Sequence, residues 1–130
     1  MNKYRKIKHR VVKLLSQYET HGSLIIGVDF DFTLYSEENG LDTKLIALLI
    51  KAQKLNCKLC LWSANENVDF IINACRMHEI SLTFDYLNES PIATSNKVNK
   101  PHFNILLDDT AGLGQAIKTL KRTLNELRKR

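Results

Sequence analysis

The sequence is poor in proline, glycine and cysteine, and it contains no long hydrophobic run. Two prolines and five glycines among 130 residues exclude a collagen-like or low-complexity chain. No apolar run approaches the roughly 20 residues of a membrane-spanning helix, and the basic first residues lack the hydrophobic region of a signal peptide. Three cysteines, an odd number, predict reduced thiols in a cytoplasmic protein rather than a disulfide framework.

Apolar patterning predicts one α/β domain over residues 1–130. Short apolar runs that suit buried parallel strands alternate with amphipathic stretches that suit crossover helices. We therefore expect a three-layer α/β/α sandwich with a mostly parallel, Rossmann-like sheet, in which residues 1–22 form a basic amphipathic helix. Residues 24–114 would be the core and residues 111–127 a final helix capped by Thr110. The strands are expected at 24–29, 58–62, 82–87 and 103–107, and the other helices at 41–55 and after Ser63.

Two of the expected strands end in paired carboxylates. The stretch LIIGVDFDFTLY (residues 24–35) runs into Asp29 and Asp31, and the run Phe103–Leu107 is followed by Asp108 and Asp109. Carboxyl ends of parallel strands meet at one edge of a sheet, where open α/β folds bind their ligands. Like charges this close repel each other unless a cation lies between them or one carboxyl keeps its proton. The acids therefore predict a site for a hard divalent cation, and Mg²⁺ with oxygen ligands fits best.

Hydroxyl and lysine side chains are expected near the same edge. Ser63 follows the strand 58–62, and Lys97 and Lys100 precede the strand 103–107. A cation and a lysine can neutralise phosphoryl oxygens, a serine can donate a hydrogen bond, and an aspartate can attack phosphorus. The combination indicates a site that handles a phosphoryl group.

The order of these motifs resembles that of the haloacid dehalogenase-like (HAD) superfamily. The matching segments are VDFDFTLY, LWSAN, SNKVNKPHF and ILLDD, spread over about residues 24–114. The segment KPHFNILLDDTAGL is similar to the end of small phosphatases of this superfamily. Phe32 stands where many members have glycine, which changes the shape of the pocket more than its chemistry. The resemblance implies a Mg²⁺-dependent phosphatase that forms an aspartyl-phosphate.

The resemblance also implies a role for each matching residue. Asp29 would be the nucleophile, and Asp31 the general acid and base, with its backbone carbonyl on Mg²⁺. Asp108 or Asp109 would complete the metal site, so the candidate metal ligands are Asp29, Asp31, Asp108 and Asp109. Ser63 would bind a phosphate oxygen, with Thr33 and Ala64 beside it on the substrate side.

The lysine of the site has two candidates. Lys97 lies eleven residues before Asp108 and Lys100 lies eight before it. A strand rises about 3.3 Å per residue, so a lysine at the start of the strand would begin roughly 15 Å below the acids. That geometry favours Lys97, whereas the lysine–proline pair at 100–101 resembles close relatives and favours Lys100. Both remain candidates.

The spacing of the motifs leaves no room for a cap domain. Only 31 residues separate Asp31 from Ser63, and 36 separate Ser63 from Lys100. HAD proteins without caps have open sites that serve large substrates, or close the site by forming homo-oligomers. A nucleotide or a polynucleotide end is therefore a substrate to test.

The net charge of +5 is concentrated at the two ends of the chain. Residues 1–13 hold six Lys or Arg and no acid, and residues 118–130 hold six with only Glu126 against them. These ends could bind nucleic acid. The simpler alternative is a pair of solvated helix faces, because the ends lack interleaved aromatic residues.

Three other functions compete with a phosphatase. The spacing Cys57-x-x-Cys60 with Cys75-x-x-His78 could suggest zinc, but residues 57 and 60 would point to opposite faces of a strand. Buried small hydrophobic residues are the simpler role for the cysteines. A receiver-like regulatory domain also clusters aspartates, but its phosphorylated aspartate closes a middle strand. A HAD-fold protein that binds nucleic acid or a partner without turnover is the third alternative.

Overall fold

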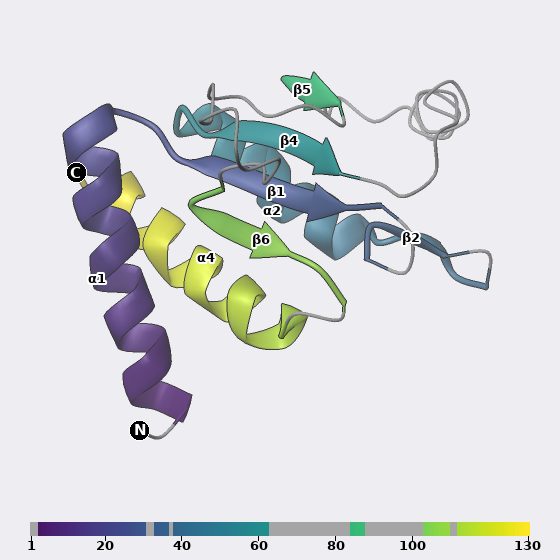
Figure 1. The fold of residues 1–130 in the computed structure, drawn as a ribbon, viewed down its shortest axis with the longest axis horizontal. Coiled ribbons are helices and arrows are strands. Elements are labelled where there is room, and N and C mark those ends of the chain that lie inside the picture. The colour runs from purple at the N-terminus through teal and green to yellow at the C-terminus, as the bar shows by residue number, and fades with distance from the viewer. Residues whose placement is uncertain (1–2, 31–32, 37, 63–83, 88–102, 110–111) are drawn as a thin grey trace, which may run out of the picture.

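The computed structural model describes residues 3–30, 33–36, 38–62, 84–87, 103–109 and 112–130 of the chain. These residues form a four-stranded sheet with helices packed against it, and a separate two-stranded hairpin (Figure 1). The chain is therefore an α/β protein, as its apolar patterning predicts. The elements are α1 (Lys3–His21), β1 (Ile25–Asp29), β2 (Tyr35–Ser36), β3 (Gly40–Leu41), α2 (Thr43–Lys54), β4 (Lys58–Trp62), β5 (Tyr86–Leu87), β6 (Ile105–Leu107) and α4 (Leu113–Arg128).

The sheet has the strand order β5-β4-β1-β6, and each neighbouring pair is parallel. Strand β1 lies inside the sheet, where it pairs with β4 on one side and with β6 on the other. Val28 of β1 is level with both Leu61 and Leu107. The carboxyl ends of β1, β4 and β6 therefore lie at one edge, which is where the acidic residues were expected to meet.

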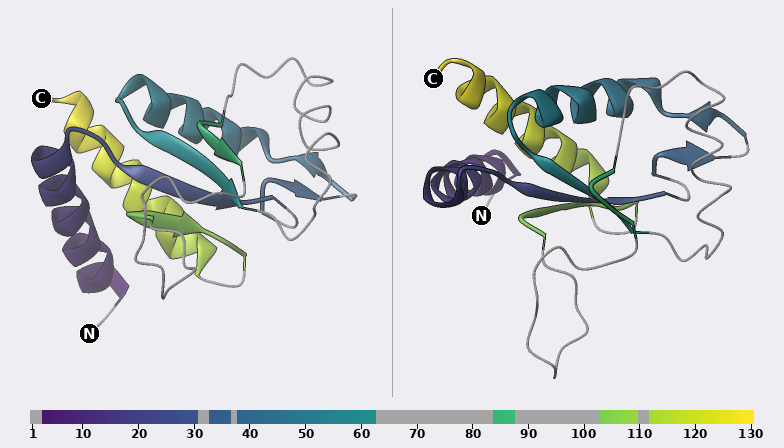
Figure 2. Two further views of the ribbon diagram at one scale, coloured as in Figure 1. Left: turned by 45° about the horizontal axis from the view of Figure 1, so that its top comes forward. Right: turned by 90° about the horizontal axis from the view of Figure 1, so that it is seen from above.

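One face of the sheet packs against α2 and α4. Both helices lie on the same side of the strands (Figure 2). The side chains of Ile26 and Val28 are fully buried there, because alternate residues of a strand point to the same face. Of their neighbours in register, Ile105 is partly buried and packs against the core cluster, whereas the others belong to it. The cluster includes Leu59, Leu61, Leu107, Leu45, Leu49, Leu120 and Leu124.

The opposite face of β1 carries a glycine where Phe103 approaches the backbone. A Cβ atom built on Gly27 would lie 2.7 Å from ring carbons of Phe103. A side chain at position 27 would therefore displace the ring, and glycine allows the segment before β6 to cover the middle of β1. The second helical layer of the expected sandwich would come from residues after Ser63, which lie outside the described residues.

Helix α1 packs against α4 rather than standing apart from the domain. Ile7, Val11 and Leu14 are buried along one stripe of the helix, and the Tyr18 hydroxyl donates to the Leu55 carbonyl at 2.8 Å. Near the chain terminus, the Arg130 guanidinium pairs with the Glu19 carboxylate. Among the described helices, none is long and apolar enough to cross a membrane.

Most expected elements are confirmed within a few residues, including the helix expected at 1–22 and the strand expected at 58–62. Two details differ. The strand expected at 82–87 is described only as Tyr86–Leu87, and just before it both the backbone N–H and the carboxylate of Asp85 bond to Leu59. The expected cap of the last helix was wrong: its N-cap is Gly112, in a left-handed conformation with φ of 74°. Thr110 lies outside the described residues.

Candidate functional site

Three carboxylates meet at the carboxyl edge of the sheet. Asp29 is the last residue of β1, and Asp108 and Asp109 follow β6 directly. Since Val28 pairs with Leu107, Asp29 and Asp108 come next in register on neighbouring strands. One oxygen from each of the three carboxylates lies within 4.8 Å of the other two. The strand register thus brings together residues that are about 80 positions apart in the sequence.

A tight turn after β1 carries the chain away from Asp29. The Phe30 carbonyl accepts hydrogen bonds from the backbone N–H groups of Leu34 and Tyr35, both at 3.0 Å. The Phe30 side chain is fully buried, and its ring stacks on the Tyr35 ring with centroids 5.4 Å apart. This anchored turn fixes the position at which Thr33 returns toward the acids.

Thr33 connects the turn after β1 to the segment after β6. Its side chain is buried, and its hydroxyl oxygen accepts a hydrogen bond from the Asp109 backbone N–H at 2.9 Å. The same hydroxyl lies 3.4 Å from Asp29 Oδ2 and 3.5 Å from Asp109 Oδ1. One hydroxyl proton can serve one of these carboxylates at a time. Thr33 therefore contacts acids from both strand ends, in addition to the place on the substrate side that the resemblance implies.

Replacing Thr33 with valine should loosen the acid cluster. Valine keeps the buried volume but leaves the Asp109 N–H without its acceptor, so the protein should lose about 1–3 kcal/mol of unfolding free energy. Denaturant unfolding, monitored by circular dichroism, measures this loss. Thr33→Ser is the matched control because it keeps the hydroxyl. Equal stability of the valine variant and the wild type would contradict this role.

The donor set at the carboxylate cluster fits Mg²⁺. Octahedral coordination at about 2.1 Å places neighbouring oxygens about 3 Å apart and opposite oxygens about 4.2 Å apart. The 4.8 Å limit on the three carboxylate oxygens is close to that range, so small side-chain rotations would bring them to one ion. All three ligands are hard oxygen donors, which favour Mg²⁺ over softer metals.

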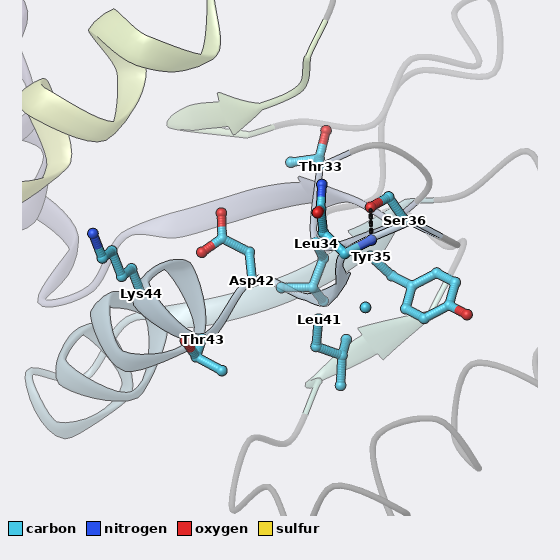
Figure 3. A pocket seen from close by; sticks show the side chains of 10 residues that line it. Thr33, Leu34, Tyr35, Ser36, Leu41, Asp42, Thr43 and Lys44 are labelled. Carbon is cyan, nitrogen blue, oxygen red and sulfur yellow. Dashed lines mark hydrogen bonds between the residues drawn. The ribbon is translucent and has the colours of Figure 1, made fainter.

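A pocket of about 370 Å³ with mixed polar and apolar walls lies next to Thr33 (Figure 3). Thr33 connects the pocket to the acid cluster, because it lines the pocket and also contacts Asp29. The other lining residues come from the hairpin β2–β3 and the start of α2, where the Asp42 carboxylate caps the helix by accepting from Leu45 N–H at 3.0 Å. The remaining lining residues are Leu34, Tyr35, Ser36, Asn39, Gly40, Leu41, Thr43 and Lys44.

The hairpin β2–β3 is not among the elements expected from the sequence. Tyr35 pairs with Leu41 and Ser36 with Gly40, and Gly40 has a positive φ of 70°. The dipeptide Asn39–Gly40 is a signal of such a turn, since both residues tolerate left-handed conformations. That signal could have identified the wall of the pocket.

The remaining candidate residues lie outside the described residues. They are Asp31, Ser63, Ala64, Lys97 and Lys100. Of the nine candidates, the structure brings together Asp29, Thr33, Asp108 and Asp109. The choice between Lys97 and Lys100 stays open.

Two of the three cysteines are buried, as expected for small core residues. Within the described part of the chain, Cys57 and Cys60 form no disulfide and belong to no cluster of metal-ligating groups. Burial raises the pKa of the Cys57 thiol to about 11, partly offset by a backbone hydrogen bond with Leu24. A thiol that stays protonated is a poor zinc ligand. Cys75 and His78 lie outside the described residues.

No protein-family model, no curated protein and no solved structure matches the chain. The functional assignment therefore rests on the geometry of the site.

Proposed function

We propose that the protein is a Mg²⁺-dependent phosphatase of the HAD type that works through an aspartyl-phosphate. The observation that carries this proposal is the convergence of Asp29, Asp108 and Asp109 at the carboxyl edge of the sheet. A carboxylate that must act as a nucleophile needs its negative charge balanced while an anionic phosphoryl group approaches. The same cluster supplies both the nucleophile and ligands for the balancing cation.

The pocket next to Thr33 supports a small polar substrate group. Its volume of about 370 Å³ lies within the range of small-molecule sites. Tyr35, Asn39 and Lys44 offer hydrogen bonds or positive charge along its walls. The phosphoryl group would lie at the acids, and the rest of a phosphomonoester would extend past Thr33 into the pocket.

Catalysis would begin with attack by an Asp29 carboxylate oxygen on phosphorus. The bond from phosphorus to the leaving oxygen breaks, and Asp31 gives its proton to that oxygen. Asp31 then removes a proton from water, which attacks phosphorus, releases inorganic phosphate and restores Asp29. Asp108 and Asp109 would hold Mg²⁺ together with Asp29. When bound, the ion neutralises charge on the phosphoryl oxygens and on the crowded carboxylates.

Residues outside the described ranges complete this proposal. Ser63 would donate a hydrogen bond to a phosphoryl oxygen, and Lys97 or Lys100 would balance its charge. The expected three-layer sandwich also belongs to the proposal, because it requires a helix on the second face of the sheet.

Hydrolysis of an aryl phosphate tests the proposal directly. With Mg²⁺ the wild-type protein should release the aryl alcohol and inorganic phosphate, and an excess of EDTA should stop the reaction. Addition of Mg²⁺ after EDTA should restore it. If neither the aryl phosphate nor a panel of nucleotides, sugar phosphates and 3′-phosphorylated oligonucleotides is hydrolysed, the alternative of a HAD-fold binding protein without turnover replaces the phosphatase.

A further inference from the structure

A second pocket lies between α1, β6 and α4, away from the carboxylates. It has a volume of about 240 Å³, and Arg10 and Lys13 form its basic side. Helix α1 lies beside α4, and α4 lies beside strand β6 (Figure 1). The other lining residues are Leu14, Asn104, Ile105, Leu106, Ala116 and Thr119.

The cations of this pocket belong to one face of α1. Lys6, Arg10 and Lys13 are spaced i, i+4 and i+7, so they follow one stripe beside the buried residues. All three are exposed. The two ion pairs found among the described residues, Lys129–Glu126 and Arg130–Glu19, use neither Arg10 nor Lys13. The two cations therefore remain available to an anion.

Asn104 adds a fixed hydrogen-bond donor to the lining of the pocket. Its side-chain oxygen accepts from the Ile25 backbone N–H at 2.6 Å, which orients the amide. Within the described part of the chain, its amide nitrogen has no hydrogen-bond acceptor. A guanidinium, an ammonium and an amide NH₂ thus surround one pocket, a donor set that suits a phosphate oxygen.

The length of the basic stripe favours a polyanion over an isolated phosphate. The seven helical steps from Lys6 to Lys13 span about 10 Å, and successive phosphates of one duplex strand advance about 3.4 Å along the axis. A membrane surface fits less well, because a membrane-bound helix exposes its apolar face. The apolar stripe of α1 is buried, and among the described residues Val12 is the one large hydrophobic side chain that is exposed.

We propose that the groove formed by α1, β6 and α4 binds the phosphodiester backbone of a nucleic acid strand, with Arg10, Lys13 and Asn104 as the contacting residues. The groove is separate from the acid cluster. Asn104 bonds to the first residue of β1, whereas Asp29 is the last, and Asn104 and Asp108 are about 13 Å apart along the strand. The proposal therefore does not depend on phosphatase activity.

Salt-dependent binding of a labelled oligothymidylate, measured by fluorescence anisotropy in EDTA, tests the groove. Arg10→Gln/Lys13→Gln should weaken binding about tenfold or more at low salt. It should also reduce the slope of log K against log salt by about 1.4, since each lost contact to a single strand removes about 0.7. The control, Lys51→Gln/Lys54→Gln, removes the same charge from exposed positions of α2 and should keep the wild-type slope.

Three results would overturn the proposal. If Arg10→Gln/Lys13→Gln and Lys51→Gln/Lys54→Gln lose the same affinity for the oligonucleotide, net charge alone drives binding. Binding to vesicles that contain anionic lipid, without binding to single- or double-stranded oligonucleotides, would mean that the surface serves a membrane. Displacement of the oligonucleotide by inorganic phosphate, at an ionic strength where chloride has no effect, would mean a site for one phosphate. The variant Arg10→Lys/Lys13→Arg changes the same two positions but keeps both charges, so it should bind as the wild type does. Such binding would show that Arg10→Gln/Lys13→Gln loses affinity through lost contacts rather than through lost folding.

Discussion

Asp29→Asn should abolish Mg²⁺-dependent hydrolysis of phosphomonoesters. The amide oxygen that replaces the carboxylate is a far weaker nucleophile, and among the described residues Asp29 alone supplies a carboxylate at the end of β1. We expect kcat to fall by about 10³-fold or more, which corresponds to about 4 kcal/mol of transition-state stabilisation. Initial rates with an aryl phosphate at saturating Mg²⁺ measure the change.

The folded state of this variant should survive the substitution. Three carboxylate oxygens lie within 4.8 Å of one another, so removing one charge relieves repulsion when no cation is bound. In EDTA, Asp29→Asn should therefore unfold at the same denaturant concentration as the wild type or at a higher one. A variant that retains more than about a tenth of the wild-type kcat would rule out Asp29 as the nucleophile.

The double variant Asp108→Asn/Asp109→Asn should mainly weaken the metal site. Two of the three clustered carboxylates then lose the charge that attracts Mg²⁺. With about 1.4 kcal/mol for each tenfold change and about 1.5–3 kcal/mol for each charged contact, half-activation should need about 100-fold more Mg²⁺. A titration of activity against Mg²⁺ concentration gives this constant, and excess Mg²⁺ should recover part of the rate.

A matched control separates this effect from a change in net charge. Glu19→Gln/Glu126→Gln also removes two carboxylates, which pair with Arg130 and Lys129 at the surface, so it should leave the Mg²⁺ titration unchanged. If the double variant is activated at wild-type Mg²⁺ concentrations, Asp108 and Asp109 do not hold the ion.

The meeting of the acids could be predicted from the sequence because it depends on topology. Two apolar runs that end in carboxylates imply parallel strands, and neighbouring parallel strands bring their ends together. The predicted grouping of Asp29 with Asp108 and Asp109 is confirmed by the geometry of the strand ends. Their role as metal ligands stays a prediction.

The contacts of Thr33 could not be predicted in the same way. Its bond to the Asp109 N–H depends on how the turn after Phe30 closes, and no periodicity in the sequence encodes that closure. The pocket depends on the hairpin from Tyr35 to Leu41, where two strands of two residues each are too short to give an alternating pattern. For the last helix, Thr110 offered a capping side chain, but the chain enters the helix through the left-handed Gly112.

The groove between α1 and α4 could not be predicted from the sequence either. Charge at both ends of the chain was evident, but charge alone did not place any cation beside another element. The pocket that joins Arg10 and Lys13 to Asn104 arises because α1 packs against α4 next to the edge of β6.

The measurement that tests the central claim most directly is the location of the phosphoenzyme. The protein would be mixed with substrate and Mg²⁺, quenched in acid during turnover, digested, and analysed by mass spectrometry. We expect one added phosphoryl group on the peptide that contains Asp29, and none in Asp29→Asn. A phosphoryl group on another residue, or rapid turnover without any phosphorylated peptide, would contradict it.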